Sequence, residues 1–196
     1  FWREKQILEA NSRQERVLMQ VFQKGAQVVL GGMDEALSIL RVATGYWRDE
    51  SEASVCFQEY LKWQQKQYVL QVRQRWDQLS DLDQDGLDIQ KKLSTLWVDT
   101  HADLSIEAMV DGDVLEPYQA VLTIDGKASD FSHLESIYLG VLARSTKIAT
   151  HVKRVVQVAQ GKPVLFFSDR FDRFENQFSD GYTALRAGVS GVATPA

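Results

Sequence analysis

The segment that most constrains the fold is the continuous apolar run Val164-Leu165-Phe166-Phe167. A strand in which neighbouring residues are all apolar buries both of its faces, which is typical of the parallel sheets of α/β proteins. A short helix is predicted over Tyr182–Ala187, and a second apolar stretch follows it. The order strand, helix, strand predicts the first unit of an α/β sheet or barrel.

Charged and aromatic side chains follow that run directly, in the sequence SDRFDRF over residues 168–174. Ligands of α/β proteins bind at the carboxyl ends of parallel strands. At such an end the ring of Phe167 can stack on a flat ligand, and the guanidinium of Arg170 can pair with a carboxylate or phosphate. Arginine–aspartate pairs in loops are also common as structural ion pairs, so the residues by themselves leave both interpretations open.

Earlier segments predict a mixed α and β region. Alternating apolar residues and Asp-Gly turns predict an antiparallel sheet over 104–126, and the stretches 16–24 and 27–32 predict a strand pair. A short helix is expected to begin at Met33. Ser132 and Glu135 are spaced as a capping box, which predicts the start of one helix, and a second predicted helix ends at Gly161.

A long helical pattern occupies residues 51–79. Its apolar residues recur at spacings of three, four or seven and form one stripe. The members of the stripe are Phe57, Leu61, Tyr68, Val72, Trp76 and Leu79. This stripe favours a helix that packs on its own domain, and a partner-binding helix fits the same pattern.

The sequence DLDQDGLDIQKK (81–92) begins like a calcium-binding loop. The twelfth position, where such loops carry a bidentate glutamate, is Lys92. We therefore expect a solvated turn between two helices and no calcium site. His101, His133 and His151 lack the spacing of zinc ligands, so no metal site is predicted.

Charge and composition exclude several classes of protein. The net charge of −5 and the pI near 5.2 argue against a nucleic-acid-binding surface. No apolar run approaches the ~20 residues that span a bilayer, so no membrane segment is expected. The single cysteine, Cys56, excludes an internal disulfide and fits a reducing cytoplasm. Because the sequence begins at Phe1 rather than Met and ends in GVATPA, we interpret it as a piece of a longer protein.

Three passages resemble the nicotinate phosphoribosyltransferase family. They are VVLGGMDEALSIL (28–40), DGDVLEPYQAVLTIDG (111–126) and the region from His133 to Thr194. The resemblance implies an α+β N-terminal domain over 1–126, partly a β-sandwich, with a helical insertion at 51–102. It further implies connecting helices and the first strands of an irregular α/β barrel over 127–196, with the barrel truncated.

The resemblance also implies roles for residues at the strand ends. Phe167 corresponds to an aromatic residue that packs on the pyridine ring, and Arg170 to an arginine near the base and the phosphoribosyl group. Relatives carry two consecutive arginines, whereas here the second arginine is Arg173. Thr194 falls near the end of the next strand. The helix that carries Lys147, Lys153 and Arg154 lies near the phosphate-binding region in the family, although these cations also fit a solvated helix face.

The family transfers phosphoribosyl from phosphoribosyl pyrophosphate to a pyridine base in NAD biosynthesis. Mg²⁺ binds the phosphates, nicotinate-specific members couple the reaction to ATP hydrolysis, and the active unit is a homodimer. The strands that carry the phosphoribosyl pyrophosphate site are expected beyond Ala196, so this piece is not expected to catalyse alone. Four alternatives stay open: a quinolinate enzyme, a nicotinamide enzyme, a non-catalytic binding module on the same fold, and a carrier module resembling half of a biotinyl or lipoyl domain.

Overall fold

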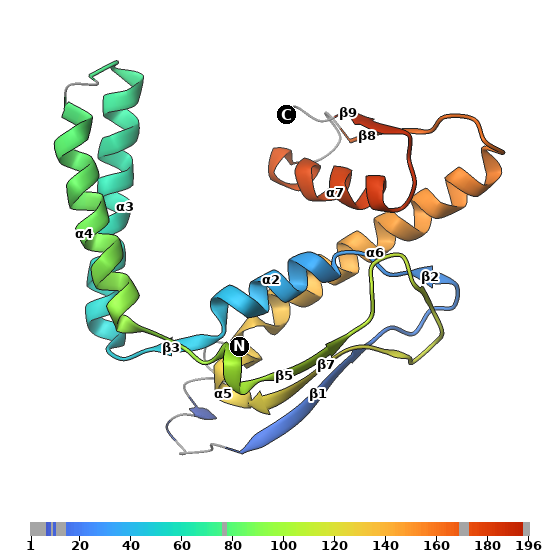
Figure 1. Ribbon diagram of the computed structural model, residues 1–196, viewed down its shortest axis with the longest axis horizontal. Coiled ribbons are helices and arrows are strands. Elements are labelled where there is room, and N and C mark those ends of the chain that lie inside the picture. The colour runs from blue at the N-terminus through green and yellow to red at the C-terminus, as the bar shows by residue number, and fades with distance from the viewer. Residues whose placement is uncertain (1–6, 9, 11–14, 76–77, 169–172, 194–196) are drawn as a thin grey trace. The chain divides into compact units, whose positions relative to one another are not determined.

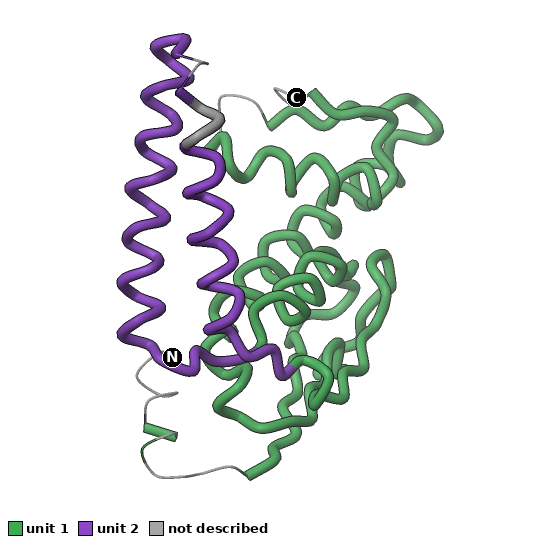
Figure 2. The backbone as a smooth tube through the Cα atoms, turned by 60° about the vertical axis from the view of Figure 1, so that its left-hand side comes forward, with its two compact units in different colours: residues 1–44, 101–196 green, residues 45–100 purple. Residues whose placement is uncertain are grey.

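The computed structural model describes residues 7–8, 10, 15–75, 78–168 and 173–193, without the side chains of residues 79–81. The chain divides into two compact units (Figure 2). Unit 1 comprises residues 1–44 and 101–196, and unit 2 comprises residues 45–100. The segment 51–102, which we expected to be an insertion, falls almost wholly in unit 2. The expected boundary between residues 126 and 127 stays a prediction.

Unit 1 combines small sheets with helices (Figure 1). Its elements are β1 (Arg16–Phe22), β2 (Val28–Val29), α2 (Met33–Ala43), the 3₁₀ turn η2 (His101–Asp103), β5 (Ser105–Ala108), β6 (Val114–Leu115), β7 (Ala120–Lys127), α5 (Ala128–Phe131), the 3₁₀ turn η3 (Ser132–Leu134), α6 (Glu135–Val158), β8 (Leu165–Phe167), α7 (Phe174–Arg186) and β9 (Gly191–Ala193). The expected mixed α/β class is confirmed, and the described strands form no closed barrel.

The main sheet is antiparallel, with strand order β1-β7-β5. The antiparallel sheet expected over 104–126 is therefore confirmed. The expected pairing of 16–24 with 27–32 is wrong, because β1 pairs with β7 and β2 pairs with β6. The chain bends out of the sheet between β1 and β2, where the Gln23 side chain accepts a hydrogen bond from Gly25 N and Gln27 has φ 54°. These local contacts leave β1 free to take a distant partner.

Helices α2 and α6 lie side by side and share the first core cluster with β7 (Figure 1). Gly31 and Gly32 permit this approach, because a Cβ on Gly32 would lie 2.7 Å from Ser145 Cβ. The short helix expected from Met33 is confirmed as α2. Its first turn is fixed by Asp111, whose carboxylate accepts a hydrogen bond from Met33 N at 2.8 Å.

The capping box expected at Ser132 and Glu135 is wrong. Ser132 already has helical angles (φ −58°, ψ −32°), whereas an N-cap residue needs an extended backbone. Its hydroxyl has no hydrogen-bond partner among the described residues. The two helices expected between Ser132 and Gly161 are one helix, α6, which ends as expected before Gly161 at φ +83°.

Tyr138 of α6 is fully buried, and its hydroxyl donates to Met19 Sδ at 3.3 Å. Burial raises the pKa of Tyr138 above its ordinary value of about 10, and the charge of Glu135 adds to the rise. An unfolded chain loses this proton near pH 10 while the folded chain keeps it. The stability that Tyr138 contributes is therefore complete below pH 10 and decreases as the pH rises above it.

We expect Tyr138→Phe to show a smaller loss of stability than the parent protein between pH 10 and 11. The difference is at most about 1.4 kcal/mol per pH unit, the free energy of one proton. Urea unfolding at pH 8, 10 and 11 measures it. Tyr118→Phe is the matched control, because Tyr118 is 66% exposed. Equal losses in the parent protein and Tyr138→Phe would contradict the assignment.

Unit 2 is a helical hairpin (Figure 2), and two short strands pair at its base. Its elements are β3 (Gly45–Trp47), α3 (Glu50–Val72), α4 (Leu79–Leu96) and β4 (Trp97–Asp99). Strands β3 and β4 are antiparallel, and Trp47 packs edge-on against Trp97 with ring centroids 4.8 Å apart. Asp49 caps α3 by accepting a hydrogen bond from Glu52 N at 2.8 Å. The long helix expected over 51–79 is confirmed in its first 22 residues.

The turn expected over 81–92 is wrong, because these residues lie inside α4. Gly86, which suggested the turn, instead packs between helices: a Cβ there would lie 2.3 Å from the Trp63 ring. The Trp63 indole also donates to Leu82 O at 2.6 Å. In a helix each residue is rotated by about 100° from the one before it, so residues two apart point about 160° away from each other. Asp83 and Asp85 therefore do not face one cation. No group of three or more His, Cys, Asp or Glu placed to hold a metal occurs among the described residues.

The apolar stripe of α3 was expected to pack on its own domain, but its described members are exposed. Ala53 and Cys56, which are small and buried, form the α4-facing side together with Trp63. Phe57, Leu61, Tyr68 and Val72 are all exposed, Trp76 lies outside the described residues, and the side chain of Leu79 is not described. Among the described helices, none has a stretch long and apolar enough to cross a bilayer.

Candidate functional site

The strand, helix and strand expected at the end of the chain are confirmed as β8, α7 and β9. Strands β8 and β9 are parallel, with Leu165 opposite Gly191 and Phe167 opposite Ala193. Helix α7 begins at Phe174, earlier than the expected Tyr182. It packs on α6 through a second core cluster that includes Ala149, Val152, Ala184 and Ala187.

The expectation that β8 is buried on both faces is wrong. Phe166 packs against the second core cluster, whereas Leu165 is 73% exposed and Phe167 is 56% exposed. Among the described strands only β9 lies beside β8, and the cluster covers only the face that carries Phe166. Phe167 is therefore an accessible aromatic ring at the carboxyl end of a parallel strand.

Of the four residues that the resemblance assigned to the site, two are described. Phe167 ends β8, and Arg173 is the N-cap residue of α7, with φ −61° and ψ 140°. Arg170 and Thr194 lie outside the described residues. Next to Phe167, the hydroxyl of Ser168 is buried and has no hydrogen-bond partner among the described residues. The strand end thus offers a ring, a guanidinium on the connection to α7 and a buried hydroxyl.

A half-buried ion pair joins α7 to α6. Arg144 donates from Nε to Asp180 Oδ1 at 2.8 Å and from Nη2 to Asp180 Oδ2 at 2.7 Å. The Asp180 side chain is only 4% exposed, and the Arg144 side chain is 40% exposed. Because α7 connects β8 to β9, this pair helps to hold both strand ends in place. Sequence reasoning missed it, since the two residues are 36 positions apart.

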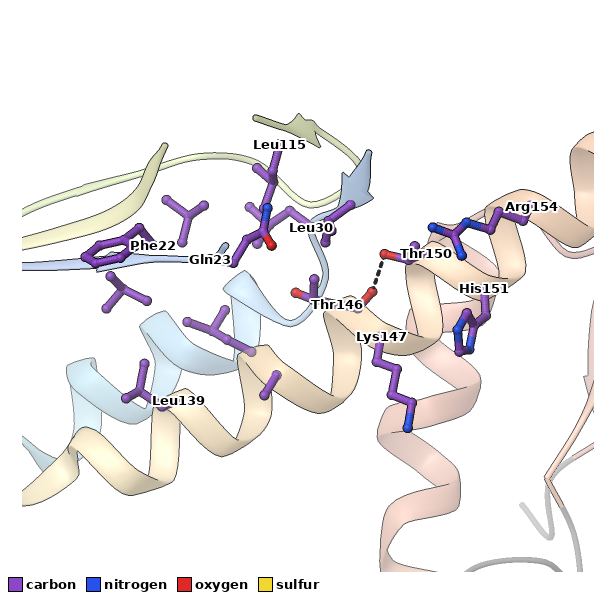
Figure 3. A pocket seen from close by; sticks show the side chains of 15 residues that line it. Phe22, Gln23, Leu30, Leu115, Leu139, Thr146, Lys147, Thr150, His151 and Arg154 are labelled. Atoms are coloured by element: carbon purple, nitrogen blue, oxygen red, sulfur yellow. Dashed lines mark hydrogen bonds between the residues drawn. The ribbon is translucent and has the colours of Figure 1, made fainter. Parts of the chain in front are cut away.

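A cavity of about 480 Å³ lies between α6 and the strands β1, β2, β6 and β7 (Figure 3). One wall is apolar and includes Phe22, Leu30 and Leu115. The α6 wall is apolar at one end, with Leu139, Leu142 and Ala143, and polar at the other, with Thr146, Lys147, Thr150, His151 and Arg154 (Figure 3). Lys147, His151 and Arg154 lie on successive turns of the helix.

Cationic and ionisable side chains line this cavity on one face of α6. Lys147, His151 and Arg154 are spaced by four and three residues, which places them on the same helix face. Lys153 is not among the lining residues. Sequence reasoning had considered Lys147, Lys153 and Arg154 and had missed His151, although the four-and-three spacing was readable. Lys147 and Arg154 are exposed at the rim of this cavity, and an apolar wall with cations at its rim suits a ligand that is partly flat or apolar and partly anionic.

Thr150 anchors the polar wall. Its hydroxyl donates to Thr146 O at 2.7 Å, which Figure 3 shows, and accepts from Val29 N at 2.9 Å. The second bond ties α6 to β2 at Thr150, which lines the cavity. Since both bonds are buried or half-buried, they fix the helix turn on which Lys147 and His151 stand.

No protein-family profile matches the sequence, and no curated protein matches it either. Solved structures do match. A nicotinate-nucleotide pyrophosphorylase from Pyrococcus furiosus superposes with a TM-score of 0.64 at 21% identity, over 97% of this chain and 35% of that chain. Human nicotinic acid phosphoribosyltransferase superposes with a TM-score of 0.63 at 14% identity, over 97% of this chain and 34% of that chain. A nicotinate-nucleotide pyrophosphorylase from Ehrlichia chaffeensis superposes with a TM-score of 0.54 at 13% identity, over 94% of this chain and 47% of that chain.

The chain therefore spans about a third to a half of the length of the structures it matches. The superpositions cover nearly all of the chain. The resemblance read from the three sequence passages is confirmed at the level of the fold: this chain has the fold of a part of the nicotinate-nucleotide pyrophosphorylase and nicotinic acid phosphoribosyltransferase structures.

Proposed function

We propose that the protein to which this chain belongs transfers phosphoribosyl from phosphoribosyl pyrophosphate to a pyridine base, as an enzyme of NAD biosynthesis. The observation that carries the proposal is the match of 97% of the chain to both a nicotinate-nucleotide pyrophosphorylase and a nicotinic acid phosphoribosyltransferase. Nicotinate is the first candidate base. Quinolinate and nicotinamide are the alternatives, because identities of 13–21% to the matched structures do not select the base.

In this reaction the bond between C1 of the ribose and the pyrophosphate oxygen breaks, and a bond from C1 to the pyridine nitrogen forms. Positive charge develops on the ribose while negative charge leaves with pyrophosphate. A protein accelerates such a step by orienting the base and by neutralising the leaving group. The chain's own contribution would be to hold the base and to supply guanidinium or ammonium groups to anionic oxygens.

The exposed ring of Phe167 supports a role in stacking on the pyridine base. Arg173 stands at the start of α7, and Arg170 precedes it on the same connection. Both arginines are proposed to pair with the carboxylate of the base or with phosphate, for which the planar guanidinium is suited. Thr194, just after β9, is proposed as a further contact to the substrate. Lys147 and Arg154, on the cavity wall of α6, are the second candidates for phosphate contacts.

Mg²⁺ enters this proposal as part of the substrate, bound to the phosphates of phosphoribosyl pyrophosphate. No step is assigned to a resident metal, and the described residues include no group of three or more His, Cys, Asp or Glu placed to hold one. Coupling to ATP hydrolysis and assembly as a homodimer are further parts of the proposal that belong to the complete protein. We expect residues 1–196 alone to be inactive.

The test is a transfer assay on the complete protein with phosphoribosyl pyrophosphate, Mg²⁺ and each of nicotinate, quinolinate and nicotinamide, with and without ATP. We expect nucleotide product from one base. Phe167→Ala should lower kcat/KM about tenfold, since a stacked ring contributes up to about 1.4 kcal/mol. Leu165→Ala is the matched control, because Leu165 is exposed on the same face of β8 two residues earlier.

Two outcomes would count against the proposal. A folded complete protein that forms no nucleotide from any of the three bases contradicts the transferase activity. Equal kinetics for Phe167→Ala and Leu165→Ala removes Phe167 from the site while leaving the activity in place. A parallel comparison of Lys147→Ala with Lys153→Ala tests the α6 wall, because only Lys147 lines the cavity.

A further inference from the structure

Two hydrogen bonds join α7 to the first turn of α2. The hydroxyl of Ser179 donates to Glu35 Oε2 at 2.7 Å, and the hydroxyl of Tyr182 donates to Asp34 Oδ2 at 3.2 Å. The paired residues are 144 and 148 positions apart in the sequence, and Figure 1 shows the N-terminal end of α2 next to α7. Hydrogen bonds to carboxylates are stronger than those between neutral groups, so these two contacts can hold one helix on the other.

The turn that carries the two carboxylates is itself held firmly in unit 1. Met33, the first residue of α2, is buried, and its backbone N–H donates to Asp111 Oδ1 at 2.8 Å. Immediately before it, a Cβ on Gly32 would lie 2.7 Å from Ser145 Cβ, so α2 begins in direct contact with α6. Because this turn is packed and hydrogen-bonded on both sides, it is a fixed support for whatever its side chains contact.

The contacts with α2 and with α6 hold α7 from two directions. At about 100° per residue, Ser179 and Tyr182 point within about 60° of each other around α7. Asp180, which pairs with Arg144 of α6, and Ala184, which belongs to the core cluster shared with α6, point about 130–170° away from that direction. A helix held from one side can turn about its own axis, whereas contacts on two sides oppose this rotation.

The rotation of α7 matters because of the residues at its start. Helix α7 connects β8 to β9, and Arg173 is its N-cap residue. Each of the two strands has three residues, and among the described strands each pairs only with the other. An isolated pair of short strands is only marginally stable and does not fix the helix that joins it. The orientation of Arg173 relative to Phe167 therefore depends on the other contacts of α7.

We propose that Asp34 and Glu35 are positioning residues for the end of β8. They accept hydrogen bonds from α7, and by opposing its rotation they hold Arg173 in one orientation beside Phe167. Neither carboxylate contacts the substrate. For its kinetic consequence this inference rests on the proposed transferase function, whereas the hold of α2 on α7 is measured without substrate.

The first test is hydrogen exchange on the complete protein with the double variant Ser179→Ala, Tyr182→Phe. This variant removes both donor hydroxyls from α7 and keeps the acidic residues that stabilise the start of α2 through the helix dipole. We expect the amides of residues 178–184 to exchange at least about fivefold faster than in the parent protein. Ser38→Ala is the matched control, because the Ser38 hydroxyl donates to Asp34 O within α2. Equal exchange in the double variant and the parent protein would overturn the proposal.

The second test measures KM and kcat separately, with the base that the complete protein uses. In the double variant we expect KM for that base to rise about fivefold and kcat to change by less than about twofold, because Arg173 is proposed to bind the substrate. A smaller folded fraction would instead lower kcat and leave KM unchanged. Glu35→Ala should raise KM about threefold, whereas Glu35→Gln keeps an acceptor for Ser179 and should stay within about twofold of the parent protein.

Exchange and kinetics together separate a failure of this inference from a failure of the proposed function. Faster exchange of α7, with no nucleotide formed from any of the three bases, would support the hold of α2 on α7 and contradict the transferase function. Faster exchange with an unchanged KM would overturn the positioning role of Asp34 and Glu35. Equal KM values for Glu35→Gln and Glu35→Ala would overturn it as well, because only the glutamine retains the acceptor.

Discussion

Replacing Gly32 with alanine is expected to lower the free energy of unfolding by about 2–4 kcal/mol, one of the largest effects of a single methyl group in this chain. Gly32 has φ +87°, a conformation that residues with a side chain adopt at a cost. The added Cβ would also lie 2.7 Å from Ser145 Cβ and 2.9 Å from Ser145 Oγ on α6. Strain and overpacking therefore act together at the contact between α2 and α6.

Chemical denaturation followed by circular dichroism measures this loss. Gly140→Ala is the matched control: Gly140 lies in α6, and nothing would lie within 4 Å of its added Cβ. There alanine should stabilise the helix by up to about 1 kcal/mol, because its helix propensity exceeds that of glycine. Finding that Gly32→Ala loses less than about 1 kcal/mol would show that α2 can move away from α6 at little cost.

Replacing Arg144 with alanine should destabilise unit 1 by about 3 kcal/mol. The substitution leaves the Asp180 carboxylate buried without its guanidinium, and breaking a buried pair in this way costs about 3–5 kcal/mol. We expect the lower end of that range, because the Arg144 side chain is 40% exposed and water can partly replace it. The loss should be concentrated in α7 and the strands it joins.

Hydrogen exchange on the complete protein shows which elements lose stability in Arg144→Ala, and urea unfolding measures the loss in free energy of unfolding. Lys153→Ala, an exposed cation on the same helix, should change stability by less than about 0.5 kcal/mol. The double variant Arg144→Met, Asp180→Leu should recover part of the loss, since it removes the buried charge as well as its partner. A double variant as unstable as Arg144→Ala would mean that side-chain packing, and not the unpaired charge, causes the loss.

Local sequence patterns correctly predicted the helices and strands whose conformation depends mainly on neighbouring residues. The alternation over 104–126 gave the antiparallel strands, and the apolar run ending at Phe167 with the helix after it gave the parallel pair β8 and β9. Helix α2 followed from the periodicity after Met33. In each case the side-chain period matches the backbone period, so no distant contact is needed to read it.

The predictions from the sequence were wrong where contacts between residues far apart in the sequence determine the structure. The partner of β1 is β7, about 100 residues away, and nothing in the local sequence distinguishes it from β2. Gly86 looked like a turn residue because its role, the contact with Trp63, depends on a second helix. At the candidate site, Phe167 was found from its position after an apolar strand, whereas Asp180 and the cavity along α6 exist only once α6, α7 and the sheet are assembled.

Helix α6, which we had expected to be two helices, is one continuous helix that contributes to both core clusters of unit 1. Its 24 residues extend about 36 Å without a break. Tyr138 and Leu142 belong to the first core cluster, and Ala149 and Val152 to the second. A hinge between two helices would have let the antiparallel sheet and the β8–β9 pair move separately. Because one helix contributes to both core clusters, the antiparallel sheet and the β8–β9 pair are packed on one continuous helix with no hinge between them.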